Sequence, residues 1–258
     1  MKLAQKNAIV TGGASGMGRL IATQLADEGA NVAVLAPEEE LLEEAATSLQ
    51  REGNQTCALL CDVCNEQQIQ QTIQEVKNRF GSIDILVNNA GIAGPTAPLQ
   101  DVQLADWEKT LAINLTGAYL CSQQVLPGMI EQKSGRIVNI SSMAGRIAFP
   151  LRGPYAASKW GLVGLTLAVA KEVGADGIQV NAICPGPVAG QRIDDVIASK
   201  AAEEGREVAD VNAEFVDTTL PKRFVKQEDV ANMVVYLCSD AGAAITGQAL
   251  EISCGYAI

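Results

Sequence analysis

The sequence predicts an α/β protein, a single domain built on a doubly wound parallel sheet with helices on both faces. Three observations predict it. Short apolar segments alternate with helical patterns along the chain, a glycine-rich loop follows the first apolar segment, and polar residues directly follow several others. The 258 residues can bury one large core. No internal repeat, low-complexity tract or linker divides them, so we expect one domain over residues 1–258.

The first element is a short apolar strand, Asn7 to Thr11, followed at once by a glycine loop from Gly12 to Gly18. A helical pattern runs on through Ala30, and residues 31–36 form the next expected strand. In such a strand–loop–helix unit, glycines permit the turn and close approach of the backbone, and the helix N-terminus attracts a pyrophosphate. The loop therefore predicts dinucleotide binding on a Rossmann-type fold.

The alternation continues through the next segments of the chain. We expect helices and strands at residues 38–51 (helix), 56–61 (strand), 67–80 (helix) and 83–87 (strand). Polar residues follow the two strands, at Asp62-Val63 and at Asn88-Asn-Ala-Gly91. Ligands of parallel sheets lie beyond the carboxyl ends of the strands, so these loops are expected at the same edge as the glycine loop.

The second half of the chain adds further elements of both kinds. We expect them at residues 107–126 (helix, with Asn114 inside it), 136–140 (strand), 155–173 (helix), 176–184 (strand), 228–239 (helix) and 248–253 (strand). The chain from Val188 to about Lys222 is charged and irregular, with one helix near Asp194 to Glu204. This segment is typical of a lid over a substrate.

The stretch from Ser141 to Lys159 carries the predicted chemistry. Tyr155 and Lys159 are four residues apart, so they share a helix face. An ammonium near a phenol favours the phenolate, which would make Tyr155 a general acid or base. Ser142, at a strand end, could donate a hydrogen bond to a substrate oxygen. A tyrosine and a lysine at this spacing also occur on ordinary solvated helices, so the hypothesis depends on the flanking motifs.

Composition narrows the function further. The net charge of −11 argues against nucleic acid and anionic membranes as partners, because both need a basic surface. No apolar run is long enough to span a bilayer, and the N-terminus lacks a signal sequence, so we expect a cytoplasmic protein. Seven cysteines, an odd number, suit reduced thiols. The chain has no histidine, which excludes a Ser-His-Asp triad, and Cys61-x-x-Cys64 alone makes a poor zinc site, so no metal is expected.

Taken together and in this order, the motifs resemble the short-chain dehydrogenase/reductase superfamily in its single-domain form, over essentially the whole chain. The matching motifs are Thr11-Gly-Gly-Ala-Ser-Gly-Met-Gly18, Asp62-Val63, Asn88-Asn-Ala-Gly91, Asn114, Ser142, Tyr155-x-x-x-Lys159 and Pro185-Gly186. The resemblance implies a seven-stranded parallel sheet with a nicotinamide dinucleotide across its carboxyl edge. It also implies an NAD(P)-dependent oxidoreductase that interconverts a secondary alcohol and a ketone by hydride transfer.

The resemblance assigns roles to individual residues. Tyr155 would exchange the hydroxyl proton, Lys159 would assist it and bind the nicotinamide ribose, and Ser142 would polarise the carbonyl oxygen. Asn114 would hold a water that relays protons to Lys159; a structural helix kink is the alternative for Asn114, and both roles can coexist. The cofactor contacts implied are Gly12, Ser15, Gly16, Met17, Gly18, Asp62, Val63, Asn89, Ala90, Gly91, Tyr155, Lys159, Pro185, Gly186 and Val188.

The residues after the second strand bear on the choice of cofactor. The family usually ends that strand with Asp for NAD, or follows it with Arg for NADP. Here these places hold Ala36 and Pro37, so neither signal is present. Glu38, Glu39 and Glu40 follow and would repel the 2′-phosphate of NADP. We therefore expect NAD, with NADP as the alternative.

Side chains able to hold an anionic or polyhydroxy substrate flank the predicted site: Arg146, Arg152, Gln191 and Arg192. Guanidinium groups bind carboxylates, sulfonates and phosphates in a bidentate manner. The competing interpretation, which we favour, is that the arginines pair with acids of the lid such as Asp194, Asp195 or Glu203.

Two other functions remain compatible with the fold. One is a non-catalytic dinucleotide-binding protein, and the other is an epimerase or dehydratase that holds NAD tightly. The intact tyrosine, lysine and serine favour the oxidoreductase, acting on a small-molecule substrate. The resemblance further implies a homo-oligomer, commonly a tetramer, with helices 107–126 and 155–173 as interface elements.

Overall fold

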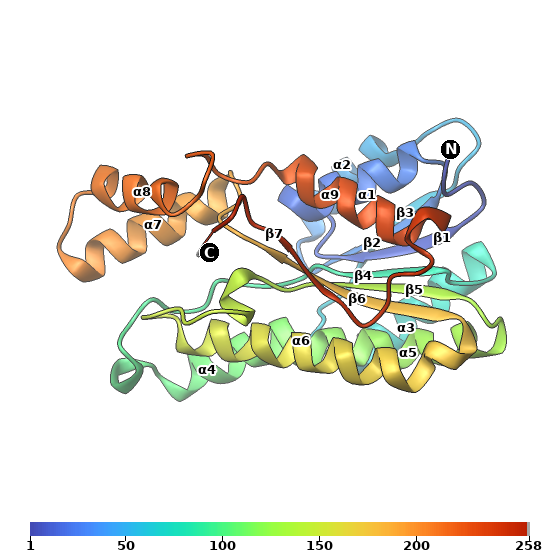
Figure 1. Cartoon of the computed structure of the whole chain (residues 1–258). Helices are drawn as coiled ribbons and strands as arrows, with labels where there is room; N and C mark the ends of the chain where they lie inside the picture. Colours follow the sequence, from blue (N-terminus) through green and yellow to red (C-terminus); the bar gives the residue numbers. More distant parts are fainter. Residues whose placement is uncertain (257–258) are drawn as a thin grey trace.

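The computed structural model describes residues 1–256 and shows a seven-stranded sheet in which every pair of neighbouring strands is parallel (Figure 1). The strand order is β3-β2-β1-β4-β5-β6-β7. The strands are β1 Asn7–Thr11, β2 Asn31–Ala36, β3 Thr56–Leu60, β4 Ile85–Asn88, β5 Gly135–Ile140, β6 Ile178–Pro185 and β7 Ala249–Ile252. The predicted Rossmann-type fold is confirmed.

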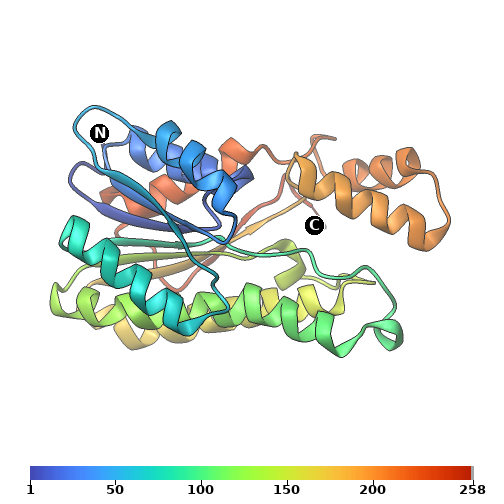
Figure 2. The ribbon, with the colours of Figure 1, turned by 180° about the vertical axis from the view of Figure 1, so that it is seen from behind.

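Helices cover both faces of the sheet. They are α1 Gly16–Asp27, α2 Glu39–Leu49, α3 Glu66–Phe80, α4 Leu104–Leu111, α5 Gly117–Glu131, α6 Gly153–Val173, α7 Gln191–Glu204, α8 Val208–Asp217 and α9 Gln227–Cys238. The α1, α2 and α9 helices lie on one face, and α3, α4, α5 and α6 on the other (Figures 1 and 2). The α7 and α8 helices project beyond the end of the sheet.

The core is divided by the sheet into two apolar layers. In β1, Ala8 and Val10 pack into the layer under α1 and α9, whereas Ile9 between them packs into the opposite layer. All three are fully buried. Burial on both faces explains why the strands are continuous apolar runs, since alternate residues of a strand point to opposite faces.

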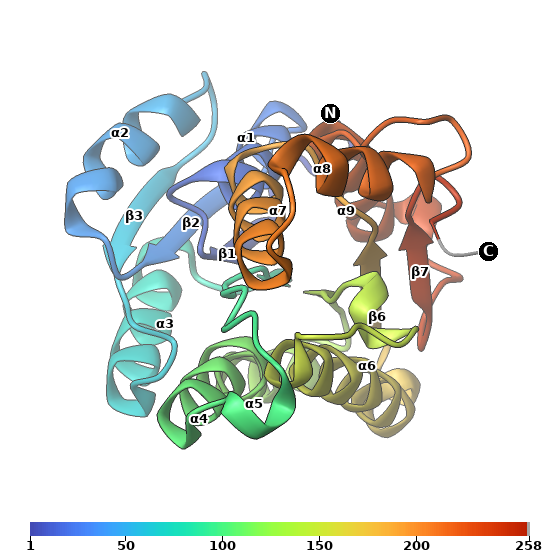
Figure 3. The same cartoon turned by 90° about the vertical axis from the view of Figure 1, so that its left-hand side faces the viewer.

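The strand order reverses between β1 and β4, and this reversal positions the site. From β1 the chain builds outward through β2 and β3, then returns to place β4 on the other side of β1. In open parallel sheets such a switch point leaves a crevice at the carboxyl ends of the strands. Figure 3 shows the molecule from this end, with α7 and α8 in front of the sheet.

Two elements differ from the sequence prediction. The helix expected at 107–126 begins at Leu104 and contains a π-helical stretch, Ala112–Thr116, between α4 and α5. The segment predicted to act as a lid was expected to hold one helix and holds two. The second helix, α8, was not predicted, although Val211 and Phe215 are four residues apart and bury one face against α7.

The ends of the α7–α8 segment are fastened together. Val188 and Val225 form an isolated parallel bridge. The Ala189 N–H donates to the Val225 carbonyl at 2.9 Å, and the Val225 N–H donates to the Pro187 carbonyl at 2.8 Å. Residues 189–224 therefore leave the body of the protein and return to it at one place. Among residues 1–256, no helix is both long and apolar enough to cross a bilayer.

Candidate active site

A cavity of about 600 Å³ lies at the carboxyl edge of the sheet. It is lined by the loops after β1, β4, β5 and β6, by the start of α6, and by α7 and α8. The cavity brings together most of the predicted site residues: Gly12, Ser15, Gly16, Met17, Gly18, Asn89, Gly91, Ser142, Arg152, Tyr155, Lys159, Pro185, Gly186, Val188, Gln191 and Arg192. Segments far apart in the sequence thus share one site.

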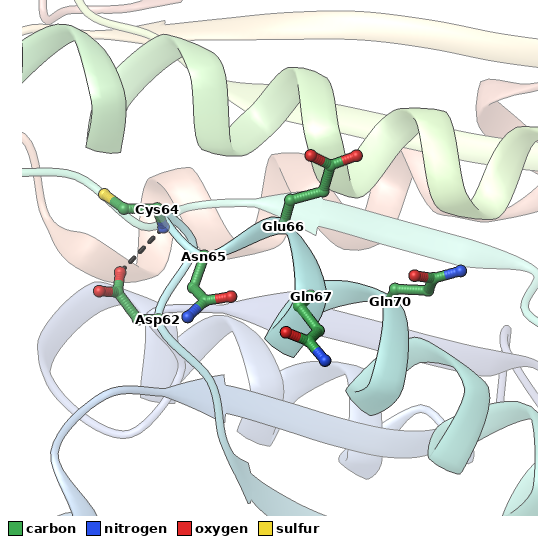
Figure 4. Close-up of a pocket in the computed structure, with 6 residues that line it drawn as sticks. All are labelled: Asp62, Cys64, Asn65, Glu66, Gln67 and Gln70. Atoms are coloured by element: carbon green, nitrogen blue, oxygen red, sulfur yellow. Dashed lines mark hydrogen bonds between the residues drawn. The ribbon is translucent and has the colours of Figure 1, made fainter.

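Five predicted residues do not line the cavity: Asp62, Val63, Ala90, Asn114 and Arg146. Asp62 instead lies in a separate, shallow hollow at the start of α3, where its carboxylate accepts the Cys64 N–H at 2.9 Å (Figure 4). The other side chains in this hollow are amides and one further acid, and they spread over the surface of the helix (Figure 4). Val63 is buried.

The glycine loop is locked to the loop after β4. A Cβ on Gly18 would overlap the carbonyl oxygen of Gly12 and the amide nitrogen of Asn89, so this position accepts only glycine. The Asn89 side chain donates to the carbonyls of Thr11 and Gly12, each at 3.0 Å. The Thr11 hydroxyl accepts the N–H groups of Asn89 and Ala90. Sequence analysis missed Thr11, although a hydroxyl between a strand and a glycine loop was a usable signal.

The loop fits the pyrophosphate of a dinucleotide. It lies at the N-terminus of α1, where N–H groups unpaired within the helix and the helix dipole favour an anion. Close backbone packing at Gly12 and Gly18 leaves this end of the cavity free of side-chain bulk. The same cavity continues to Tyr155, so one extended ligand can reach both ends.

Tyr155 and Lys159 lie on one face of α6, which begins at Gly153 and has Pro154 in its first turn. The Lys159 ammonium nitrogen lies 5.7 Å from the centre of the Tyr155 ring. It donates a hydrogen bond to the Ile140 carbonyl at 2.8 Å, which fixes the side chain beneath the end of β5. The predicted pairing of phenol and ammonium is present in the structure.

The two serines after β5 differ in what their hydroxyls can do. Ser141 is buried, and its hydroxyl donates to the Lys159 carbonyl at 3.0 Å. Ser142 is half-buried, and its oxygen accepts the Ala144 N–H at 3.1 Å. No protein acceptor in the described part of the chain takes the hydroxyl proton of Ser142. Only Ser142 therefore has a proton available to a ligand in the cavity.

Asn114 lies in the π-helical stretch and is fully bonded to its surroundings. Its oxygen accepts the Ile92 N–H at 2.8 Å, and its nitrogen donates to the Ile92 carbonyl at 3.0 Å and the Ser158 hydroxyl at 3.1 Å. A Cβ on Gly91 would lie 3.1 Å from the Asn114 oxygen and 3.6 Å from the Lys159 nitrogen. Asn114 therefore fixes the backbone at Gly91 and Ile92, which lies between the Asn114 and Lys159 side chains.

Burial gives Lys159 an unusual protonation equilibrium. The side chain is 3% exposed, and this desolvation, with the nearby charge of Arg192, lowers the pKa of Lys159 from 10.5 to about 7, while Cys184 opposes the shift. Between pH 7 and 10.5 the unfolded chain holds a proton that the folded chain has lost. Burial of the Lys159 side chain therefore lowers the free energy of unfolding by an amount that grows as the pH falls from 10.5 to about 7.

We expect Lys159→Met to gain stability relative to the wild type as the pH is lowered across this window. The gain should approach roughly 4 to 5 kcal/mol between pH 10.5 and 7, because each pKa unit corresponds to about 1.4 kcal/mol. Loss of the bond to Ile140 adds an offset that does not depend on pH. Urea unfolding at several pH values measures the difference. Lys171→Met, on an exposed lysine of the same helix, is the control, and a difference independent of pH would contradict the prediction.

The arginines do not pair with the lid as expected. Arg146 is exposed and pairs with Glu251 of β7 at 3.4 Å. Arg192 donates to the Gly91 carbonyl at 2.6 Å. Arg152 and Arg192 form no ion pair with an aspartate or glutamate of residues 1–256. The expected pairing is therefore wrong for all three arginines.

The acids of the lid find partners nearer to hand. Asp195 accepts a hydrogen bond from the Gln191 side chain at 2.8 Å. Glu214 pairs with Lys200 and with Arg206, each at 2.6 Å, which ties α7 to α8.

The apolar lining of the cavity was not predicted. It consists mainly of Ile92, Met143, Phe149, Ile193, Val196, Phe215 and Tyr256. These residues come from the ends of strands, the lid and the C-terminal segment, which only the fold brings together. They give the cavity an apolar wall in addition to its polar and charged groups.

None of the cysteines is among the residues that line the cavity. All seven, within the described chain, are free thiols. Cys61 is buried and Cys64 is exposed. Burial, and then the charge of Asp62, raise the pKa of the Cys64 thiol to about 11, so it is largely protonated at neutral pH. No group of three or more candidate metal ligands occurs in residues 1–256.

Comparison with known proteins gives a consistent set of relatives. The profile of the family described as short chain dehydrogenase matches residues 6–209. The 3-oxoacyl-(acyl-carrier-protein) reductase FabG of Staphylococcus epidermidis is 36% identical over 251 residues, covering 97% of this chain and 98% of the relative. A crystal structure of NAD⁺-bound xylitol dehydrogenase superposes with a TM-score of 0.95 at 32% identity, covering 98% and 99% of the two chains. Levodione reductase superposes with a TM-score of 0.92 at 32% identity, covering 98% of each.

Proposed function

The chain belongs to the short-chain dehydrogenase family, and on that premise we propose that it is an NAD(P)-dependent oxidoreductase that interconverts a secondary alcohol and a ketone. One observation carries the proposal. Tyr155, Lys159 and Ser142 share a cavity with the glycine loop, so a bound dinucleotide and a proton-exchanging phenol can meet over one substrate. The relatives named above are reductases and a dehydrogenase, which supports this class of reaction.

The proposed chemistry assigns one task to each side chain. Tyr155 takes the hydroxyl proton during oxidation and returns it during reduction. Lys159, held near the phenol ring, stabilises the phenolate by its charge when it is protonated. Ser142 donates its free proton to the substrate oxygen, and Asn114 positions the chain beside Lys159. The nicotinamide dinucleotide supplies the hydride acceptor or donor.

We propose that the dinucleotide is held by the glycine loop at one end and by the loop after β6 at the other. The residues are Gly12, Ser15, Gly16, Met17, Gly18, Asn89, Gly91, Pro185, Gly186 and Val188. Asp62, Val63 and Ala90 are proposed contacts outside the cavity lining. The α7–α8 segment is proposed to act as the lid, since it supplies part of the cavity wall.

We propose NAD as the preferred cofactor. Ala36 at the end of β2 is buried and apolar, and Glu38, Glu39 and Glu40 are exposed at the start of α2. Residues 36–40 include no cation that could receive a 2′-phosphate, and the carboxylates would repel one. The NAD⁺-bound xylitol dehydrogenase structure is consistent with this choice.

The experiment is to follow nicotinamide absorbance with a panel of secondary alcohols and NAD or NADP, then with the matching ketones and NADH or NADPH. We expect NAD to give a kcat/KM at least about 10-fold higher than NADP, equivalent to about 1.4 kcal/mol. Pro37→Arg should narrow this ratio by adding a cation beside the ribose. Equal use of both cofactors would contradict the cofactor proposal.

The same panel tests the reaction class. Bound dinucleotide without turnover in either direction would favour a non-catalytic dinucleotide-binding protein. Isomerisation or loss of water without net cofactor turnover would favour an epimerase or dehydratase. We further propose a homotetramer assembled through the long helices, because Tyr119 of α5 and Trp160 and Leu167 of α6 expose apolar side chains.

A further inference from the structure

Arg152 is a buried cation in the half of the cavity that holds Tyr155. Its side chain is 4% exposed, and its guanidinium carbon lies 5.4 Å from the centre of the Tyr155 ring. The guanidinium donates to the Ala93 carbonyl at 2.6 Å and to the Thr96 hydroxyl at 3.2 Å. Its Nε is buried with no hydrogen-bond partner in the described structure. Buried charges in proteins are normally paired, so this one lacks a counter-ion.

The charge of the cavity as a whole has the same sign. The ionisable residues of opposite type in its lining are three basic side chains and one carboxylate: Arg152, Lys159, Arg192 and Asp195. The two arginines are charged throughout the neutral range, and Lys159 adds its charge below a pH of about 7. Asp195 is engaged by Gln191. Burial lowers the pKa of Arg152, and the charge of Arg192 lowers it further, while Tyr155 opposes this. A positive cavity in a chain of net charge −11 concentrates anions at one place.

The backbone before Arg152 is held in an uncommon conformation. Leu151 has a φ of +63°, in the left-handed region that bulky side chains rarely adopt. Its carbonyl accepts the Ala97 N–H at 2.9 Å, which fastens this loop to the one after β4. Such strain persists only where the surroundings enforce it, and it is concentrated at binding and catalytic sites. It sets the position of the following residue, Arg152.

We propose that the substrate carries an oxyanion, a carboxylate or a sulfonate, a few bonds from its carbinol or carbonyl carbon, and that Arg152 binds this group. Arg192, on the lid, contributes a second positive charge to the same cavity. The apolar side chains of Phe149 and Tyr256 in the lining reduce the local dielectric and strengthen the attraction. This inference rests on the proposed function, because it names the substrate of the same site.

The pyrophosphate of the cofactor does not account for Arg152. The fold places the pyrophosphate at the N-terminus of α1, beside the glycine loop. Arg152 belongs to the segment between β5 and α6, beside the phenol that exchanges the proton. The counter-ion of Arg152 must therefore come from the substrate.

The test compares anionic ketones with neutral ketones of nearly the same shape. The pairs are acetoacetate with acetoacetamide, and 2-oxopropanesulfonate with methylsulfonylacetone, each reduced with NADH. For at least one pair we expect the wild type to show a kcat/KM about 100-fold higher for the anion, since removing one member of a buried charge pair commonly has effects of this size. Ratios near one in both pairs would overturn the inference and leave the proposed function intact.

Variants identify the residue responsible. Arg152→Met should bring the preferred ratio to within about threefold of one, and Arg152→Lys should retain part of the preference. Arg146→Met is the matched control, because Arg146 lies outside the cavity and pairs with Glu251. A preference that persists in Arg152→Met would overturn the assignment to Arg152. The wild-type ratios need no variant, so they test the substrate class even if Arg152→Met fails to fold.

Binding without turnover separates the two proposals. Calorimetry on the wild type saturated with NAD⁺ measures the affinity of each ketone, because a ketone cannot be reduced by the oxidised cofactor. Tighter binding of the anion, lost in Arg152→Met, supports the inference even where NADH is never consumed, and in that case the oxidoreductase proposal fails. Equal binding of the anion and the neutral ketone, with reduction observed, would overturn the inference about the substrate and leave the oxidoreductase proposal standing.

Discussion

Replacing Tyr155 with phenylalanine is expected to lower kcat by about 10³-fold while dinucleotide affinity stays within about twofold of wild type. The substitution removes only the phenol hydroxyl, which is the part of the side chain that can exchange a proton. The ring remains and still packs in the cavity. General acid or base catalysis by one positioned side chain contributes roughly 10² to 10⁴-fold. The loss should therefore appear in kcat, with little change in folding or cofactor binding.

The control for this measurement is the same substitution at a tyrosine elsewhere on the protein. Tyr236 of α9 is largely exposed and lies outside the cavity, so Tyr236→Phe should leave kcat unchanged. Dinucleotide binding by calorimetry and thermal unfolding are followed in both variants. If Tyr155→Phe kept more than about a tenth of the wild-type kcat, another group would have to carry the proton.

Gly18→Ala is expected to weaken dinucleotide binding by about 100-fold or more. A methyl group there would overlap the carbonyl oxygen of Gly12 and lie 2.9 Å from its carbonyl carbon, and both are backbone atoms that cannot rotate away. Overpacking of this kind costs about 1 to 3 kcal/mol, and about 2.7 kcal/mol corresponds to 100-fold in affinity. The glycine loop would have to move away from α1, which disrupts the pyrophosphate site.

A second glycine separates this effect from the general consequences of an added methyl group. Gly128 is inside α5, and a Cβ there meets nothing within 4 Å. Gly128→Ala should preserve binding and raise the stability slightly, by up to about 1 kcal/mol, because alanine is the better helix former. Calorimetric titration with NAD and thermal unfolding are compared in the two variants. Equal dinucleotide affinity in Gly18→Ala and the wild type would refute the expected loss.

Much of the sheet could be predicted from the sequence because its central strands are buried on both faces. β2 was predicted at its observed boundaries, since Asn31 and Pro37 bracket a run with no polar residue inside it. Polar residues at the strand ends marked the edge where the cavity lies. The helix α8 was missed because only two of its residues, Val211 and Phe215, are buried, and they pack in a small cluster that is separate from the core of the sheet.

The site was predictable only where its members are close in sequence. The spacing of four residues between Tyr155 and Lys159 identifies this pair in the sequence, and the position of the glycine loop directly after a strand identifies the loop. Only the structure gives a physical reason to choose Ser142 over Ser141. The Ser141 hydroxyl donates its proton to the Lys159 carbonyl, whereas the Ser142 hydroxyl keeps its proton available. That Arg152 bonds to the Ala93 carbonyl and the Thr96 hydroxyl and not to a lid carboxylate could not be foreseen, because only the fold brings these distant segments together.

The bridge between Val188 and Val225 makes the α7–α8 segment an exchangeable cassette. Its two ends meet at one point, so another length of chain can replace residues 189–224 without moving the strands. Closing a longer loop between fixed ends costs little additional free energy, about 0.6 kcal/mol for each doubling of the loop length. Substrate range can therefore diverge between descendants of one ancestral scaffold through this cassette, while the hydride-transfer machinery is inherited unaltered.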